Sequence, residues 1–339
     1  MENKEKKFTA SGDAEAENLL KRVLFEMKET LSGTGLCVVL GGSYARGEGG
    51  VRSDRQKGLL FNDLDFFVFA EKDVPDGEKI LSELAAKYHK QLKIDVDFSR
   101  IMQIAVLQKD CRRLMMQELK RNYYHVSGRD FLAEYLVEIP AEKLPFEEAF
   151  RLLLNRGMGL LFAAEKIAGN DIDGDFILRN IYKAVLGAGD AVLISSHNYC
   201  WKIAERCEAV QILDMDEKYK KLYANAVAYK REPHGNIDAE TAVLWRNAAD
   251  FLQYAVLKCA GTHDAAKLDE SIYLKCRKNG ETSLFNLIKY CLKSRKLVFS
   301  LKYTAPAVSV VLDELYDELA KSINSIDSGR LMRHWLKFN

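Results

Sequence analysis

The sequence predicts an α+β protein, with an N-terminal α/β domain over residues 1–130 and an all-α helical domain over residues 131–339. Short apolar runs that suit buried strands occur within the first hundred residues. From Phe146 onward, apolar residues recur at steps of three and four, and no strand-like alternation is convincing there. Because 339 residues exceed one small domain, the chain is expected to form two or three domains.

In the N-terminal domain, helices and strands are expected to alternate. The expected elements are a helix over 13–32, a strand over 36–40, a helix opening after Gly41-Gly42-Ser43, a strand over 64–69, a helix over 77–90 and a strand over 93–98. The last strand reads KIDVDF, so its two aspartates, Asp95 and Asp97, face one way and its apolar residues the other.

In the second domain, the periodicity predicts helices throughout. Their expected ranges are 146–168, 175–196, 201–230, 238–260, 281–299 and 308–325. Only five prolines occur in the whole chain, which is consistent with a mostly helical protein.

Composition and cysteine usage exclude several classes of protein. A net charge of +1 is not the basic balance of a general nucleic-acid binder, so nucleic acid is an unlikely partner, although a local basic groove would not show in the total. The seven cysteines form no CxxC pair and the six histidines have no metal-ligand spacing, which argues against a zinc site. No apolar run is long enough for a membrane helix and no signal peptide is recognisable, so a cytoplasmic protein with reduced cysteines is expected.

Two aspartates at the head of the second strand carry the first chemical signal. Asp63 and Asp65 are two residues apart on a strand, so both point to one face. Adjacent carboxylates repel unless a cation lies between them, and Mg²⁺ binds one or two carboxylates together with substrate phosphates. We therefore expect Asp63 and Asp65 to bind Mg²⁺, with Asp95 or Asp97 as a third carboxylate that serves as ligand or general base.

A glycine-rich segment before this strand carries the second signal. Gly41 and Gly42 allow backbone N–H groups to approach an anion, and Ser43 can donate a hydrogen bond to a phosphate oxygen. A phosphate cradle opposite a carboxylate cluster suits attack on the α-phosphate of a nucleoside triphosphate.

With these motifs, LGGSYARGE, NDLDFFVF and KIDVDF, the sequence resembles the nucleotidyltransferases of the DNA polymerase β superfamily. The resemblance covers residues 36–100, and SYARGE is similar to a segment of stand-alone members related to aminoglycoside nucleotidyltransferases. It implies a polymerase-β-like domain with a small mixed sheet. It also implies Mg²⁺ as cofactor and a nucleoside triphosphate, with ATP expected, as co-substrate.

By the same resemblance, Gly41, Gly42 and Ser43 would hold the triphosphate, and Arg46 is a candidate nucleotide contact. Asp63, Asp65 and Asp95 would be the metal ligands, with Asp95 and Asp97 as the candidate catalytic acids and Asp95 preferred for the third position. The spacer from Ser43 to Asp63 is longer than is usual in the family, which indicates an inserted loop.

The helical domain offers fewer signals. Lys183 clusters with Arg179 and Tyr182 by helical spacing, and Asp190 follows Lys183 by two turns. Relatives that modify small molecules often use such a domain to bind the acceptor, so Lys183 is a candidate phosphate contact and Asp190 a candidate acceptor contact. A structural ion pair is the alternative for each of them. The basic run around Lys230 is interpreted as a solvated face.

The sequence thus predicts transfer of a nucleoside monophosphate, AMP in the expected case, to a hydroxyl of a small-molecule acceptor. Two alternatives remain open at this point. One is a macromolecular acceptor, either a protein side chain or an RNA end. The other is a non-catalytic module of the toxin–antitoxin type.

Overall fold

The computed structural model describes residues 6–54, 58–109, 111–169, 173–234, 236–268, 271–272 and 307–335. The chain divides into two compact units. The first unit comprises Met1–Pro140 together with Ala228–His234, and the second comprises Ala141–Val227 and Gly235–Asn339. Residues 228–234, expected from sequence to belong to the helical domain, therefore belong with the first unit.

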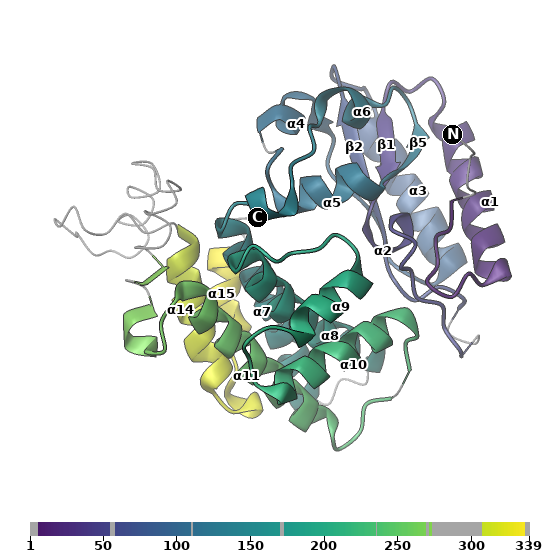
Figure 1. Cartoon of the computed structure of the whole chain (residues 1–339). Coiled ribbons are helices and arrows are strands. Elements are labelled where there is room, and N and C mark those ends of the chain that lie inside the picture. The colour runs from purple at the N-terminus through teal and green to yellow at the C-terminus, as the bar shows by residue number, and fades with distance from the viewer. Residues whose placement is uncertain are drawn as a thin grey trace. The chain divides into compact units, whose positions relative to one another are not determined.

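The first unit is an α+β structure built on a small mixed sheet (Figure 1). Its elements are α1 (Ala14–Leu31), β1 (Cys37–Leu40), α2 (Gly42–Ala45), β2 (Leu64–Ala70), α3 (Gly77–Leu92), β3 (Val96–Phe98), β4 (Met102–Gln103), α4 (Ala105–Lys109), α5 (Leu114–Asn122), β5 (Tyr124–Ser127) and α6 (Phe131–Tyr135). The strand order is β3-β2-β1-β5, and β4 also pairs with β2. Strand β2 is parallel to β3 and β4, whereas β1 is antiparallel to β2 and β5, which confirms the expected fold class and mixed sheet.

Each face of the sheet is covered by an apolar cluster. On one face, residues of α1 and α3 such as Leu20 and Leu84 pack with Val38 and Phe66 of the strands. On the other face, α5 and α6 cover Val39 and Phe69 of the same strands. Burial of one such apolar side chain contributes about 1.5–3 kcal/mol, so both faces anchor β1 and β2 firmly.

Strand β5 and helix α5 were not predicted from the sequence. Strand β5 reads Tyr-His-Val-Ser and has no clear apolar alternation, because it is the last strand of the sheet and contacts it along one edge only. Its pairing with β1 also shifts register between Val38 and Val39, where a bulge interrupts the ladder.

The long spacer between Ser43 and Asp63 forms a loop whose base is closed by Tyr44. The Tyr44 hydroxyl donates to the carbonyl of Gly50 at 2.9 Å and accepts from the amides of Phe61 at 3.0 Å and Asn62 at 3.3 Å. The Asn62 side chain accepts from the Gly50 amide at 2.7 Å. The two described ends of the loop therefore meet.

The same hydroxyl is held in its protonated form. Burial raises the pKa of Tyr44 well above its ordinary value, and the negative charge of Asp63 acts in the same direction. Tyr44 is thus protonated at neutral pH and can donate the hydrogen bond to the Gly50 carbonyl.

The second unit is helical in the parts that the structure describes. Its helices are α7 (Glu147–Ala168), α8 (Gly174–Ser195), α9 (Ile203–Gln211), α10 (Glu217–Arg231, whose last turn belongs to the first unit), α11 (Thr241–Ala260), α14 (Ala307–Ala320) and α15 (Ser328–Trp335), with short 3₁₀ turns at Ala141–Lys143, Ala265–Lys267 and Ile323–Ser325. Helix α7 packs against α8, α11 and α14, and α11 also packs against α8 and α14. Between α7 and α11, the buried Trp245 donates its indole N–H to the carbonyl of Leu160 at 2.8 Å.

Most of the predicted helices of this unit are confirmed, but one is wrong. The expected helix 201–230 is broken between Gln211 and Glu217, where Asp216 accepts a hydrogen bond from the Lys218 amide and so begins α10. The expected helix 281–299 lies outside the described residues.

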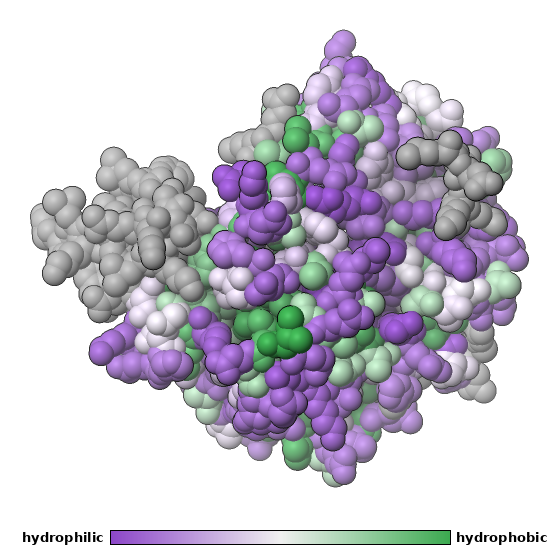
Figure 2. Space-filling view, viewed as in Figure 1, coloured by the Kyte–Doolittle hydropathy of each residue, from purple (hydrophilic) through white to green (hydrophobic). Residues whose placement is uncertain are grey.

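The hydropathy of the surface and the burial of the cysteines are two further features of the fold. Hydrophilic residues predominate on the face seen in Figure 2, and apolar residues form small areas between them. Over the ranges given above, no helix is both long and apolar enough to span a membrane. Of the five cysteines described, Cys37 and Cys259 are buried, and burial raises the pKa of Cys37 to about 11.

Substitution of Tyr44 tests whether its hydroxyl closes the loop. Tyr44→Phe leaves two amides and one carbonyl without their partner, so we expect the first unit to lose about 1–3 kcal/mol of unfolding free energy. Urea denaturation measures this loss, and hydrogen exchange should accelerate at the amides of Phe61 and Asn62. Tyr88→Phe is the matched control, because the Tyr88 ring is fully buried but its hydroxyl contacts side chains only (Lys87 and Glu26). Equal losses in the two variants would contradict the role of Tyr44.

Candidate functional site

A turn at Gly41–Gly42 lies against Asp65 of β2. The Gly41 amide donates to the Asp65 carbonyl at 2.8 Å. Gly42 has φ = +66°, and a Cβ placed on it would lie 2.4 Å from Oδ2 of Asp65. Both the backbone conformation and the close approach require glycine at position 42. The motif therefore brings bare backbone against a carboxylate.

The register of β2 and β3 brings a second carboxylate beside Asp65. In this parallel pair Asp65 lies opposite Asp97, and Leu64 lies opposite Val96. Neighbouring strands are about 4.8 Å apart, and paired residues point to the same face, so the two aspartates are side-chain neighbours. Asp63, two residues before Asp65, belongs to the same face. Asp63 and Asp65 are half-buried, whereas Asp97 is exposed.

Asp95 occupies a different environment. It precedes β3, its carbonyl accepts from the Leu64 amide at 2.9 Å, and its side chain is 55% exposed. Its Oδ1 lies 3.7 Å from Nδ1 of His89. Asp95, preferred from sequence as the third carboxylate, thus has a histidine beside it, whereas Asp97 is the direct neighbour of Asp65.

These carboxylates can coordinate a Mg²⁺ ion that takes its other ligands from phosphate groups and water. Among the described residues, no group of three or more histidine, cysteine or acidic side chains lies close enough to hold a metal ion. Mg²⁺ does not require such a group, because it usually takes one or two carboxylates and completes its shell with phosphates and water. Asp63, Asp65 and Asp97 supply suitable oxygen donors next to the glycine turn.

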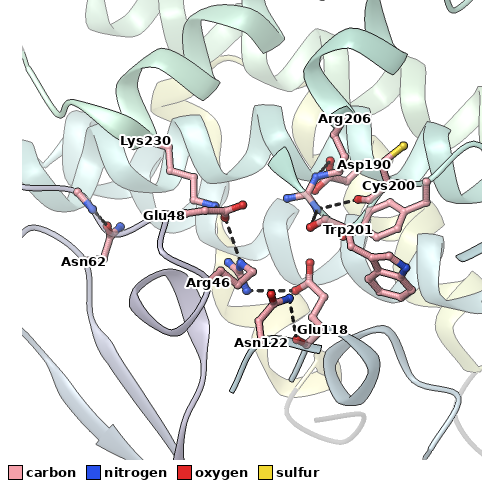
Figure 3. Close-up of polar contacts among 12 residues, drawn as sticks. Arg46, Glu48, Asn62, Glu118, Asn122, Asp190, Cys200, Trp201, Arg206 and Lys230 are labelled. Carbon is pink, nitrogen blue, oxygen red and sulfur yellow. Dashed lines mark hydrogen bonds and ion pairs between the residues drawn. The ribbon is translucent and has the colours of Figure 1, made fainter. Parts of the chain in front are cut away.

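The segment after the turn carries a charge network. Nε of Arg46 lies 3.1 Å from Glu48, and its Nη1 lies 3.5 Å from Glu118 of α5. Glu48 is shared, because Nζ of Lys230 lies 2.7 Å from the same carboxylate oxygen (Figure 3). All four side chains are at most 23% exposed. Arg46, predicted to contact the nucleotide, is therefore paired with two carboxylates, and Ser43 lies half-buried directly before Tyr44.

Residues 228–234 complete this part of the first unit, and sequence reasoning missed them. The interpretation of Lys230 as part of a solvated face is wrong, because its side chain is only 14% exposed and is paired with Glu48. Beside it, the ring of Tyr229 packs edge-on against Phe61, with centroids 5.7 Å apart. Pro233 lies against Gly50 at the base of the loop. Local sequence gives no signal for contacts across such a distance along the chain.

The two remaining predicted site residues belong to α8 of the second unit. Lys183 is half-buried there. Asp190 belongs to a largely buried network, because its Oδ1 lies 3.1 Å from Nε of Arg206 and accepts from the Tyr223 hydroxyl at 2.7 Å. Arg206 is 4% exposed and also donates to the carbonyls of Cys200 and Trp201 (Figure 3). These contacts give Asp190 a structural role, which was the alternative to an acceptor contact.

Comparisons with models of protein families, with curated proteins and with solved structures give no match to this chain.

Removal of the Asp190 carboxylate tests this structural role. Asp190→Ala leaves the buried guanidinium of Arg206 without its charge partner, so we expect a loss of about 3–5 kcal/mol in unfolding free energy. Asp250→Ala is the matched control, because it breaks the exposed ion pair between Arg246 and Asp250 within α11 and should cost less than about 1 kcal/mol. Denaturant unfolding followed by circular dichroism measures both. Similar small losses in the two variants would show that the Arg206 network does not stabilise the second unit.

Proposed function

We propose that this protein is a Mg²⁺-dependent nucleotidyltransferase that moves a nucleoside monophosphate from a nucleoside triphosphate to a hydroxyl group of a small molecule. The observation that carries the proposal is the arrangement around Asp65. One neighbour of this carboxylate is the bare backbone of Gly42, and the other is Asp97 on the adjacent strand. Backbone that can approach an anion thus adjoins carboxylates that can share a cation.

This arrangement supports the resemblance to the polymerase β superfamily, and the assignment to that superfamily is part of the same proposal. The segment that differs from the family pattern, the long spacer, is closed at its base by Tyr44 and Asn62. The insertion is therefore compatible with carboxylates at Asp63 and Asp65 acting together.

We assign the metal-ligand role to Asp63 and Asp65, and the role of the third carboxylate to Asp97. Bound Mg²⁺ would neutralise the triphosphate and polarise its α-phosphate. The Gly41–Gly42 turn and Ser43 would orient the phosphates, and the carboxylates would orient the acceptor.

In the proposed reaction, the acceptor oxygen forms a bond to the α-phosphorus, and the bond from that phosphorus to the bridging oxygen breaks to release pyrophosphate. The acceptor hydroxyl loses its proton to a carboxylate. Asp97 is the candidate base because it is the exposed member of the three.

Exchange of single carboxylates for amides tests both the activity and the assignment of the third acid. Purified protein is incubated with Mg²⁺ and each α-labelled nucleoside triphosphate, alone and with a panel of small hydroxyl compounds that includes aminoglycosides. We expect Asp65→Asn and Asp97→Asn to lower label transfer by at least about a hundredfold, because metal and proton-transfer contributions amount to several kcal/mol. Asp95→Asn makes the same chemical change two residues before Asp97. This variant should retain label transfer within a few-fold of the original protein.

The possible outcomes separate the assignments. Loss of label transfer in Asp95→Asn, together with retained transfer in Asp97→Asn, would assign the role of the third carboxylate to Asp95. Transfer of label to the protein itself or to added RNA would identify a macromolecular acceptor. Absence of both transfer and Mg²⁺-dependent nucleotide binding would overturn the proposal.

A further inference from the structure

A groove runs along the outer edge of β5 in the first unit. Its volume is about 560 Å³, which is within the usual range of ligand-binding sites. One wall is formed by Lys21, Leu24, Phe25, Lys28 and Glu29 of α1, together with Ser32 and Gly33 directly after the helix. The opposite wall is formed by the five consecutive residues Tyr124–Gly128.

The groove is bounded by the strand edge and not by one face of the sheet. Successive side chains of a strand point to opposite faces, so five residues in a row can line one cavity only along the backbone edge. Strand β5 is the last strand of the described sheet and pairs with β1 on its other side. Figure 1 shows α1 running beside this edge. The groove therefore has the form of a slot for one additional strand.

The side chains on the α1 wall favour a particular kind of strand. Phe25 is 61% exposed and lies one turn from both Lys21 and Lys28 on the same helix face. Glu29 is the one acidic side chain on this wall, so the two lysines leave it with an excess of positive charge, and an exposed aromatic ring between these cations suits a segment that combines acidic and apolar residues. On the strand wall, Nε2 of His125 is buried and has no hydrogen-bond partner among the described residues.

We propose that this groove binds an extended, acidic peptide segment of a partner protein, which pairs with β5 as an added strand. Main-chain hydrogen bonds to β5 supply affinity, and alternate side chains supply specificity through Phe25 and the two lysines. The proposal concerns a different part of the first unit from the carboxylates and does not depend on the proposed reaction.

Selection of peptides on the full chain tests the proposal. A phage-displayed library of random heptapeptides is selected on the protein and counter-selected on a Phe25→Ala, Lys28→Glu double variant. We expect enriched sequences to carry acidic residues at alternate positions. Fluorescence anisotropy with the synthesised peptides should show at least a tenfold weaker affinity for Lys28→Glu and no change for Lys90→Glu, an exposed lysine on α3.

Two further measurements check the mode of binding. A bound peptide should slow hydrogen exchange at the amides of Tyr124–Gly128, and N-methylation of alternate peptide residues should abolish affinity. The proposal would be overturned if no sequence is enriched over the double variant, if enriched peptides bind Lys28→Glu as well as they bind the original chain, or if β5 exchange is unaffected. Concentration-dependent dimerisation that Lys28→Glu abolishes would assign the groove to a second copy and would also overturn it.

Discussion

The contact between the Gly41–Gly42 turn and Asp65 is the constraint around which the first unit is organised. The turn has to pass within a few ångströms of a carboxylate, and only a residue without a Cβ can do so with a left-handed backbone at position 42. Strand β2 is fixed at this point because the Gly41 amide bonds to its backbone. Strand β3 then pairs with β2 in one register, which sets Asp97 beside Asp65.

A second set of contacts fixes the segment that follows the turn. Arg46 and Lys230 share the carboxylate of Glu48, so the segment after the turn is joined to residues far along the chain. The same distant segment covers the closed end of the inserted loop through Tyr229 and Pro233. Because these ion pairs are largely buried, removal of Glu48 would take a shared partner from two cations at once, and the cost would exceed that of a surface pair.

The sequence was a good guide to features that depend on local pattern. Helices with apolar periodicity, such as α1, α3 and α8, and the buried strands β1 and β2 were predicted close to their observed bounds. The side-chain alternation expected for KIDVDF agrees with the buried Val96 and exposed Asp97 of β3. Strand β5 was missed because an edge strand with polar residues lacks the pattern of a buried one.

Features that depend on distant contacts could not be predicted in the same way. The choice between Asp95 and Asp97 rests on strand register, which sequence spacing alone does not fix. The roles of Lys230 and Asp190 rest on partners in other elements, Glu48 in one case and Arg206 with Tyr223 in the other. A charged residue in a helical pattern looks the same whether it faces water or a buried counter-ion.

The membership of residues 228–234 in the first unit has a consequence for how the protein is made. During synthesis, the stretch to Pro140 emerges first, but Lys230 reaches Glu48 only after the whole of Ala141–Val227 has been translated. Until then, Glu48 and Arg46 lack the lysine, and the base of the loop lacks Tyr229 and Pro233. The first unit is therefore completed late on the ribosome, and the nascent chain must carry it in an unfinished form while α7, α8 and α9 are being produced.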